Sequence, residues 1–486
     1  MRTRPYRCSC RNFILFELCR SKFIAGRKVF MSKLSIEQIE ENFGDIHPAL
    51  TPAEAAVEAN RCLFCFDAPC MHACPTHIDI PGFIKKIASG NLKGSARVIF
   101  DANPVGATCA RVCPVEVLCE GACVENTLLQ KPIEIGRLQR YATDFAVAND
   151  IRLFEAGEPN GKSVGIIGSG PAGLSCATYL ARLGYAVTIY EKRLLAGGLD
   201  TYGMAEYKMR RSVSLDEVAM AENLGVEFVL DTEIVREAGV NDSIAFTDLQ
   251  RRHDAIFIGT GLGSTNKLDI PGEELDGVHD ALHFIEKIKT RDWSSVPVGK
   301  TVVVIGAGNT AVDAATQAKR LGAERVIMVY RRTEKDASAY DYEMELARKD
   351  GVEFVWQAAP VGILEGENGN RLALRCERTD GSLELFEIPC DIIIKAVGQQ
   401  KMRGFFEKIA GVDVDERGRV IVGASMQTSD PGIFAGGDCV NGGGEAVEAA
   451  QMGKLAAQGI HETLTGENVQ FAGANIASIN PSIHAD

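Results

Sequence analysis

The spacing of apolar positions divides this chain of 486 residues into a helical first part and a second part in which strands alternate with helices. From about residue 35 to 150, apolar residues recur at helical spacing, as in IPGFIKKIASGNLKGSARVIF and IGRLQRYATDFAVAN. This period is typical of amphipathic helices. Residues 151–162 lose the period and contain Gly and Pro, so we interpret them as a linker.

Two later segments each predict a strand, a glycine turn, a helix and a second strand. They are KSVGIIGSGPAGLSCATYLARLGYAVTIYEKR, from residue 162, and KTVVVIGAGNTAVDAATQAKRLGAERVIMVYRR, from residue 300. Such units build parallel sheets that helices cover on both faces. The predicted fold class is therefore α/β, with a helical domain followed by two Rossmann-like, doubly wound domains.

A third glycine-rich strand end, IFAGGDCV, lies near the end of the chain, which indicates that the second unit is inserted into the first. The chain is also too long for one hydrophobic core. The predicted parts are a basic extension outside the fold (1–30), a helical domain (31–150), a first doubly wound domain (160–285 and 400–486) and a second one (286–399).

Charge narrows the possible partners. The net charge is −13, although residues 1–30 contain eight Lys or Arg and one Glu, so the remainder is strongly acidic and repels nucleic acid and anionic membranes. No apolar stretch approaches the roughly 18 residues of a membrane span. The extension is Arg-rich, but Glu17 interrupts its apolar run, and we interpret Met31 as the start, with Ser35 and Gln38 as a capping box. We expect a cytoplasmic protein.

Eight of the fifteen cysteines form two groups ahead of the first glycine motif: Cys62, Cys65, Cys70 and Cys74, then Cys109, Cys113, Cys119 and Cys123. This density, with Pro directly after Cys74 and Cys113, is typical of thiolates that bind cubane iron-sulfur clusters. Structural zinc prefers pairs with two intervening residues, and only Cys62 and Cys65 have that spacing. A disulfide framework needs an oxidising compartment, and nothing like a secretory signal opens the chain. Iron-sulfur clusters are therefore favoured over zinc and disulfides.

The first glycine motif predicts an FAD site in the first doubly wound domain. Its residues are Gly168, Ser169, Gly170, Pro171, Ala172 and Gly173. The first glycine makes the turn, the second lets the backbone approach a pyrophosphate, and the third packs helix against strand. Glu191, at the end of the next strand, is placed to accept from ribose hydroxyls. In IFAGGDCV, Gly437 allows close approach and Asp438 is expected to accept from a ribityl hydroxyl.

The second glycine motif predicts a nicotinamide dinucleotide site in the inserted domain. Its residues are Gly306, Gly308, Asn309, Thr310 and Ala311, and the strand end IIIKAVG adds Ala396 and Gly398. Where the first unit has Glu191, this one has Arg331 and Arg332, which favour the 2′-phosphate of NADPH. Glu334 and Asp336 follow closely and would offset part of that charge, and a solvated strand end is the alternative explanation of the two arginines.

No pair of cysteines follows the first unit at the position where a disulfide reductase carries its redox-active thiols. Electrons that a flavin takes from nicotinamide are therefore expected to leave singly, through the clusters.

With these motifs in place, residues from about 34 to 465 resemble the NAD(P)- and FAD-binding iron-sulfur subunit of bacterial dihydropyrimidine dehydrogenase and, more broadly, the small subunit of glutamate synthase. The segments CPTHIDIPGFIKKIASGNLKGSARVI, NPVGATCARVCP, LCEGAC and IGRLQRYATDF carry the closer resemblance to the dihydropyrimidine branch. The resemblance implies two 4Fe-4S clusters that share ligands across the cysteine groups. One cluster is expected on Cys62, Cys65, Cys70 and Cys123, and the other on Cys74, Cys113, Cys119 and Gln139, with Cys109 as the alternative to Gln139.

The resemblance also implies FAD contacts at Gly198 and Leu199 and places Lys208 near the flavin. Around Ser338 the chain lacks a basic residue that NADP-dependent members of the family are expected to carry, which keeps NAD(H) as an alternative donor. No segment resembles an FMN barrel, so the chain is expected to be an oxidoreductase subunit in a hetero-oligomer.

Its implied partner is the FMN-binding catalytic subunit that reduces uracil or thymine to the 5,6-dihydropyrimidine. The alternatives are the small subunit of glutamate synthase, with the large subunit as partner, and a non-enzymatic redox sensor.

Overall fold

The computed structural model describes residues 34–473 except 236–242, 291–292, 294–295, 297 and 368. The predictions for the basic extension and for a start at Met31 lie outside the described residues. The capping box of Ser35 and Gln38 is present at the start of the first helix.

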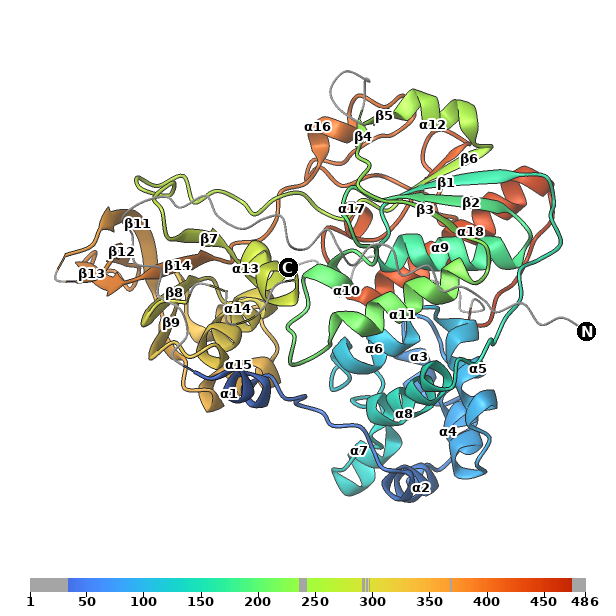
Figure 1. The fold of residues 1–486 in the computed structure, drawn as a ribbon, viewed down its shortest axis with the longest axis horizontal. Coiled ribbons are helices and arrows are strands. Elements are labelled where there is room, and N and C mark those ends of the chain that lie inside the picture. Colours follow the sequence, from blue (N-terminus) through green and yellow to red (C-terminus); the bar gives the residue numbers. More distant parts are fainter. Residues whose placement is uncertain are drawn as a thin grey trace, which may run out of the picture.

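The predicted helical domain is helical throughout and lies beneath the first sheet in Figure 1. Its helices are α1 (Ile36–Asn42), α2 (Pro52–Arg61), α3 (Pro69–His72), α4 (Ile80–Ala88), α5 (Leu92–Ala102), α6 (Gly106–Val112), α7 (Val124–Leu129) and α8 (Ile135–Ala148). Apolar side chains at helical spacing make one core, as Phe83 and Ile84 of α4 and Leu138 of α8 show. Residues 151–160 contain no helix or strand, as expected of a linker.

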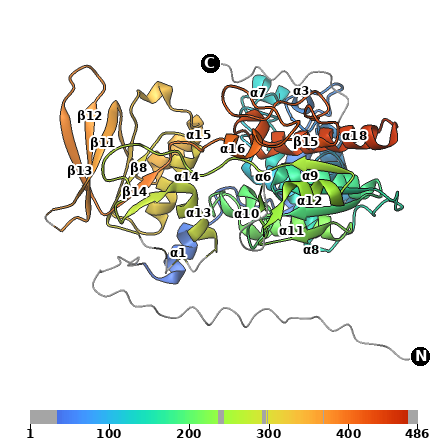
Figure 2. The same cartoon turned by 90° about the horizontal axis from the view of Figure 1, so that it is seen from above.

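The first helix departs from the predicted domain. Ile39 of α1 and Phe43 after it pack into the core of the second doubly wound domain, and Phe43 stacks on Trp293. Asn42 Nδ2 donates to the carbonyl oxygen of Arg320 at 3.0 Å, and Arg320 Nη1 donates back to the carbonyl oxygen of Asn42. Figures 1 and 2 both place α1 against that domain, so the helical domain proper begins after it.

The first doubly wound domain has a parallel five-stranded sheet of order β15-β6-β1-β2-β3. Its strands are β1 (Ser163–Ile167), β2 (Ala186–Tyr190), β3 (Glu227–Val229), β6 (Ala255–Ile258) and β15 (Ile433–Ala435), and a small pair is formed by β4 (Ile234–Val235) and β5 (Ile244–Ala245). Its helices are α9 (Pro171–Arg182), α10 (Leu199–Tyr202), α11 (Arg211–Glu222), α12 (Phe246–Arg252), α16 (Arg403–Phe406), α17 (Asp438–Asn441) and α18 (Ala446–Thr465). The long helices α9 and α18 pack side by side on one face of the sheet (Figure 1).

The second doubly wound domain has a parallel sheet of order β10-β9-β8-β14-β7. Its strands are β7 (Val278–Asp280), β8 (Thr301–Ile305), β9 (Arg325–Val329), β10 (Glu353–Val355) and β14 (Ile392–Lys395). Its helices are α13 (Ala281–Thr290), α14 (Asn309–Arg320), α15 (Asp341–Lys349) and the short 3-10 helix Glu334–Asp336. The sequence did not predict the antiparallel sheet beside it, formed by β11 (Ala358–Glu365), β12 (Leu372–Arg378) and β13 (Leu385–Cys390).

The predicted insertion is confirmed, because all strands of the second domain lie in the chain between β6 and β15 of the first. The predicted boundary at residue 286 is wrong in detail. β7 pairs with β14 in parallel, so the second sheet already includes residues 278–280. In the described ranges no helix has the length and apolar character to cross a bilayer.

Candidate functional site

The first predicted cluster ligands surround one cavity. Cys62 ends α2, Cys70 lies in α3, and Cys123 precedes α7. Together with Cys65 they line a small cavity of about 30 Å³. The rest of its wall is mainly apolar: Leu63, Ala68, Pro69, Ile80, Pro81, Ile84, Val124, Ile133, Ile135 and the carboxylate-bearing Glu125. Four side chains that are separated by up to 61 positions in the chain thus converge as the ligands of one cluster should.

A second cavity, of about 20 Å³, is lined by the other predicted ligands. Its wall includes Cys74, Cys113, Cys119, Gln139 and the alternative ligand Cys109. α6 ends at Cys113, and the buried face of α8 carries Gln139, so two packed helices bring these donors together. Val447 of α18 also lines this cavity, so the first doubly wound domain closes one side of it.

Two contacts bear on the choice between Gln139 and Cys109. Gln139 Nε2 donates to the carbonyl oxygen of Gly106 at 2.8 Å, which anchors the amide and leaves its oxygen as the atom able to bind a metal. Cys109 Sγ accepts from Asn103 Nδ2 at 3.2 Å. Both side chains reach the same cavity, so the ligand set with Gln139 stays a prediction and Cys109 stays its alternative.

The thiols need a bound cation to ionise. Burial raises the pKa of Cys70 to about 12, and Cys123 and Cys62 act in the same direction. The hydrogen bond to Cys109, followed by burial, raises the pKa of Cys113 far above its usual value. Thiolates here would therefore depend on the positive charge of a bound metal. Among the described residues, no group of three or more His, Cys, Asp or Glu side chains could hold a single metal ion. Cysteines spread around a cavity fit a multi-atom cage better than one zinc ion.

The two cavities are immediate neighbours. Ile80 lines both of them, and Cys70 and Cys74 lie within and just after the four-residue helix α3. A single layer of side chains therefore separates the two cysteine-lined spaces.

A buried lysine lies beside the second cavity. Lys454 of α18 is fully buried, and its Nζ donates to the carbonyl oxygens of Thr76 at 3.1 Å and Ala472 at 2.9 Å. Thr76 Oγ1 in turn contacts Cys74 Sγ at 3.4 Å. Burial lowers the pKa of Lys454 to about 7, whereas Cys74 acts to raise it. Two carbonyl groups do not neutralise a buried ammonium, so this charge needs an anion close by.

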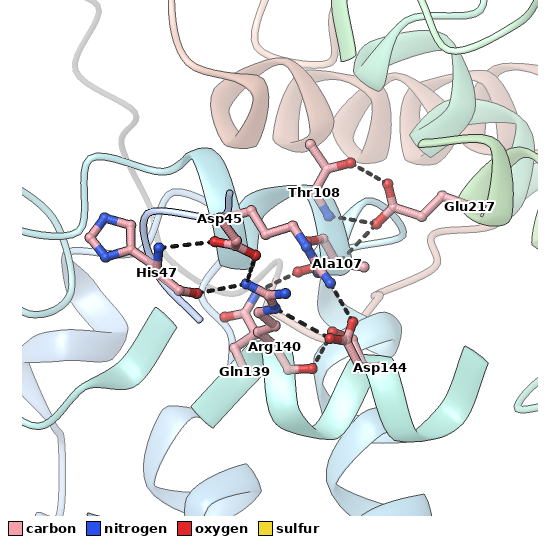
Figure 3. A network of polar contacts seen from close by, with 11 residues as sticks. Asp45, His47, Ala107, Thr108, Gln139, Arg140, Asp144 and Glu217 are labelled. Atoms are coloured by element: carbon pink, nitrogen blue, oxygen red, sulfur yellow. Dashed lines mark hydrogen bonds and ion pairs between the residues drawn. The ribbon is translucent and has the colours of Figure 1, made fainter. Parts of the chain in front are cut away.

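A buried carboxylate joins the helical domain to the first doubly wound domain. Glu217 of α11 accepts from the backbone N–H groups of Ala107 at 2.7 Å and Thr108 at 3.0 Å, and from Thr108 Oγ1 at 2.5 Å (Figure 3). These are donors of the first turn of α6, the helix that ends at Cys113. In the same view Arg140 bridges Asp45 and Asp144. Glu217 therefore fixes the helix that carries the second group of ligands.

The first glycine motif forms the predicted turn after β1. Gly168 has φ = +96°, and a Cβ there would lie 2.4 Å from the carbonyl oxygen of Gly259. A Cβ on Gly173 would lie 2.1 Å from the carbonyl oxygen of Gly168, so the third glycine is needed for α9 to pack on the turn. A Cβ on Gly170 would meet nothing closer than Gly198 Cα at 4.0 Å, which leaves room for a pyrophosphate at the start of α9. Pro171 and Ala172 form the first turn of that helix.

Glu191 holds the same turn. Its Oε2 accepts from Ser169 N at 3.1 Å and from Ser169 Oγ at 2.6 Å, and its Oε1 accepts from Arg193 N. Its predicted contact with a ribose stays a prediction.

Buried acceptors without partners lie next to this turn. Gly198 precedes α10, and a Cβ on it would lie 2.7 Å from Gly170 Cα, so Gly198 and Leu199 adjoin the glycine motif as predicted. Both carboxylate oxygens of Asp200 and Oε1 of Gln451 are buried with no hydrogen-bond partner. Burial raises the pKa of Asp200, and the pKa of Asp438 after Gly437 is raised in the same way. Unsatisfied acceptors beside an open glycine turn fit a hydroxyl-rich ligand such as FAD.

The second glycine motif is formed in the same manner after β8. Gly306 has φ = +135°, and a Cβ there would lie 2.3 Å from the carbonyl oxygen of Ala396 at the end of β14. Gly308 precedes α14, whose first turn contains Asn309, Thr310 and Ala311. Gly398 has φ = +79° and lies two residues after Ala396. The structure thus gathers these predicted contacts at one sheet edge.

Arg331 and Arg332 follow β9 on an exposed segment, and the acidic residues that were expected to offset them are engaged elsewhere. Arg348 pairs with Glu334, and Asp336 accepts from Thr333 N and Oγ1 in a capping box. Hydrogen bonds from Thr333, together with the charge of Arg332, lower the pKa of Asp336, so this carboxylate still offsets part of the charge of Arg332.

The predicted flavin neighbour Lys208 contacts the second doubly wound domain. Its Nζ lies 2.6 Å from Asp313 Oδ1 of α14 and 2.5 Å from Glu343 Oε1 of α15. Nearby, Tyr340 Oη donates to Glu445 Oε1 at 2.8 Å, and Glu445 caps α18. Polar contacts of α15 and of Tyr340 just before it therefore join the two doubly wound domains.

Sequence reasoning missed Asp200, Glu217 and Lys454. The available signal was a lone charge inside an apolar helical stretch, as in AAQMGKLAAQGI around Lys454. A larger cavity lined by Phe100, Phe154, Met220 and other residues contains none of the predicted ligands or motif residues.

Two glycine turns at the edges of parallel sheets, together with two cysteine-lined cavities in the helical domain, define a dinucleotide-dependent oxidoreductase with an iron-sulfur domain. Residues 162–453 match the sequence profile of the pyridine nucleotide-disulphide oxidoreductases, and residues 39–151 match that of dihydropyrimidine dehydrogenase domain II, 4Fe-4S cluster. The chain belongs to the pyridine nucleotide-disulphide oxidoreductase family, whose members bind FAD and NAD(P), and it carries a 4Fe-4S domain. It is an electron-transfer oxidoreductase.

Named relatives cover almost the whole chain. It is 35% identical to the NAD-dependent dihydropyrimidine dehydrogenase subunit PreT of Escherichia coli O157:H7 over 88% of this chain and 98% of that protein. It is 34% identical to the glutamate synthase [NADPH] small chain of Escherichia coli K12 over 88% of this chain and 94% of that protein. Thioredoxin reductase of Lactococcus lactis superposes with a TM-score of 0.51 at 26% identity, over 63% of this chain and 100% of that one. The predicted resemblance and fold class are confirmed.

Proposed function

We propose that this chain is the electron-input subunit of a hetero-oligomeric dihydropyrimidine dehydrogenase. It oxidises NAD(P)H and passes electrons through FAD and two 4Fe-4S clusters to an FMN-containing partner, which reduces uracil or thymine to the 5,6-dihydropyrimidine. The observation that carries the proposal is the pair of adjacent cavities lined by the predicted ligands, next to the FAD-type glycine turn.

The packing of the helices supports a particular order of the proposed centres. The second cavity touches α18, whose cap Glu445 follows Gly437 and Asp438 closely in the chain, so it lies on the flavin side. The first cavity lies one side-chain layer further away, across Ile80. When bound, FAD converts the two electrons of a hydride into single-electron steps, which the clusters accept. The protein would set the distances between these centres and their order, and would keep water away from them.

The proposed donor is NADPH, because Arg331 and Arg332 offer two guanidinium groups at the ribose end of the second fold. NADH is the alternative, since the relatives named PreT are NAD-dependent.

A second candidate is the small subunit of glutamate synthase. It is supported by the 34% identity to the NADPH-dependent small chains, which is close to the value for PreT. Both candidates share the same cofactors and differ in the partner.

The test uses the full chain purified without oxygen. We expect about eight iron and eight acid-labile sulfide per chain, one FAD, and reduction of an artificial acceptor by NADPH that exceeds the rate with NADH. Mixing with an FMN-binding dihydropyrimidine dehydrogenase subunit should yield NAD(P)H-dependent uracil reduction, and the glutamate synthase large subunit serves as the comparison. Zinc without sulfide, or no turnover of any acceptor, would contradict the proposal.

A further inference from the structure

We propose that an apolar patch over the first cysteine group is the docking surface for the electron-accepting partner. The patch consists of Leu63, Phe64, Phe66 and Leu128. This inference rests on the proposed function, because it assumes that electrons leave through the first group. It adds where the partner binds and what kind of face the partner presents.

The patch is attached directly to the predicted ligands. Leu63 and Phe64 stand between Cys62 and Cys65, and Phe66 follows at once. Leu63 and Val124 both line the first cavity. Leu128 lies four positions after Val124 on α7, hence on the same helix face. An apolar surface therefore covers the first cavity from both sides of its ligand set.

These large apolar side chains are mostly exposed to solvent. Phe66 is 100% exposed, Leu128 is 62% exposed and Leu63 is 54% exposed. Large apolar side chains gathered in one place on a surface mark a protein contact, and aromatic residues are enriched at such contacts.

The loop is also held in an unusual backbone conformation. Phe64 has φ = +51° and Asp67 has φ = +49°, in the left-handed region that bulky residues rarely adopt. The ammonium of Lys85 lies 5.9 Å from the centre of the Phe64 ring, and Asp67 Oδ1 contacts His72 Nε2 at 2.6 Å. The loop thus presents its aromatic side chains to solvent, with the Phe64 ring facing Lys85.

The position of the second cysteine group argues against it as the site from which electrons leave for the partner. The second cavity is closed by Val447 of α18 and by α6, which Glu217 fastens to the first doubly wound domain. The lining residues of the first cavity all lie between Cys62 and Ile135, within the helical domain. Cys62 and Cys65 are partly exposed, as are Cys113 and Cys119 of the second group, so the cover by α18 is what distinguishes the two cavities. The fitting partner is a redox protein with its acceptor centre near an apolar face and a carboxylate opposite Lys85.

The test compares the unmodified full chain with a Phe66→Ser/Leu128→Ser variant and with Leu385→Ser. Leu385 is a matched control, because it is 60% exposed on β13 of the inserted domain. Three quantities are measured for each: iron content, NAD(P)H-driven reduction of ferricyanide, and NAD(P)H-driven turnover with the FMN-binding dihydropyrimidine dehydrogenase subunit or the glutamate synthase large subunit.

We expect the patch variant to keep its iron content and ferricyanide reduction and to need about tenfold or more partner for half-maximal turnover, whereas Leu385→Ser behaves like the unmodified chain. Equal partner dependence in all three proteins would overturn the docking surface and leave the proposed function intact. If the unmodified chain drives neither partner, both proposals fall. A patch variant that loses only self-association, measured by sedimentation, would assign the surface to a second copy of this chain and also overturn the inference.

Discussion

The buried charge of Lys454 bears on the cluster proposed at Cys74, although Lys454 is not one of its predicted ligands. Its ammonium is fully buried, donates to two carbonyl oxygens, and is linked through Thr76 to the sulfur of Cys74. Burying a charge without an opposite charge is costly, and the 4Fe-4S cluster proposed at Cys74 would supply the opposite charge. Conversely, a fixed positive charge favours the more negative, reduced state of such a cluster.

Replacement of this lysine should therefore change a potential rather than the ligands. We expect Lys454→Met to bind the same amount of iron and to lower the midpoint potential of the cluster at Cys74, by tens of millivolts if about 1 kcal/mol of attraction is lost. The measurement is a redox titration followed by electron paramagnetic resonance. Lys289→Met is the control, because Lys289 is equally buried but pairs with Glu206, away from both cysteine groups. An unchanged potential in Lys454→Met would show that the charge is not felt by the cluster.

At the scale of elements, α6 depends on a carboxylate from another domain. No side chain of its own caps this helix, and Glu217 of α11 satisfies the first-turn N–H groups of Ala107 and Thr108 instead. Burial raises the pKa of Glu217 to about 7, against an ordinary value of 4.5. Compared with the open state, the folded state therefore favours the protonated form of Glu217. In that form the hydrogen bond between Oε2 and Thr108 Oγ1 can persist.

The sign of the pH effect follows from that shift. The contact is strongest below about pH 4.5 and weakens as pH rises through about 7, because ionisation is then more favourable in the open state. Between pH 5.5 and 8 we expect the opening free energy of the α6 start to fall by about 2 kcal/mol. Hydrogen exchange of this segment, corrected for intrinsic rates, measures it. Glu217→Gln should keep the segment closed without this pH dependence. A slope that persists in that variant would place the titrating group elsewhere.

The sequence predicted individual helices, strands and turns better than it predicted which of them pack or pair with one another. The glycine turns at Gly168 and Gly306 and the helices around the cysteines depend on local spacing, and the structure contains them. The docking of α1 on the second domain and the pairing of β7 with β14 depend on contacts between distant residues, such as Phe43 with Trp293, which no short window reveals. The convergence of Gln139 with the cysteines was expected only through a family resemblance, because an amide has no distinctive spacing.

At the scale of the whole molecule, buried ion pairs fasten the two nucleotide-binding domains together. Lys208 of the first domain lies between Asp313 and Glu343 of the second; the two carboxylates are buried, and the lysine side chain is only 11% exposed. Removing only the cation leaves two uncompensated carboxylates at the junction, which is more harmful than removing all three charges.

We expect Lys208→Met to separate the domains and to slow flavin reduction by NADPH about tenfold, for a shift of roughly 1.4 kcal/mol, at unchanged iron content. Lys208→Met/Asp313→Asn/Glu343→Gln should recover most of the rate, because the repulsion is gone. Stopped-flow absorbance gives the rate, and small-angle scattering gives the separation. Equal rates in the single and triple variants would contradict an electrostatic role, and the exposed Lys267→Met serves as a neutral control.

The insertion of one doubly wound domain into the other also determines the order in which the parts of the flavin pocket are synthesised. The edge strand β15 and the long helix α18 leave the ribosome only after the entire second sheet has been made, so the pocket for the isoalloxazine is incomplete until both have been made. The eight cysteines of the two groups, in contrast, all lie within residues 62–123 and emerge early. Metallocluster assembly machinery thus meets a nascent chain whose thiols are ready long before its flavin pocket exists, and a chain that is truncated near its end would capture iron yet carry no yellow chromophore.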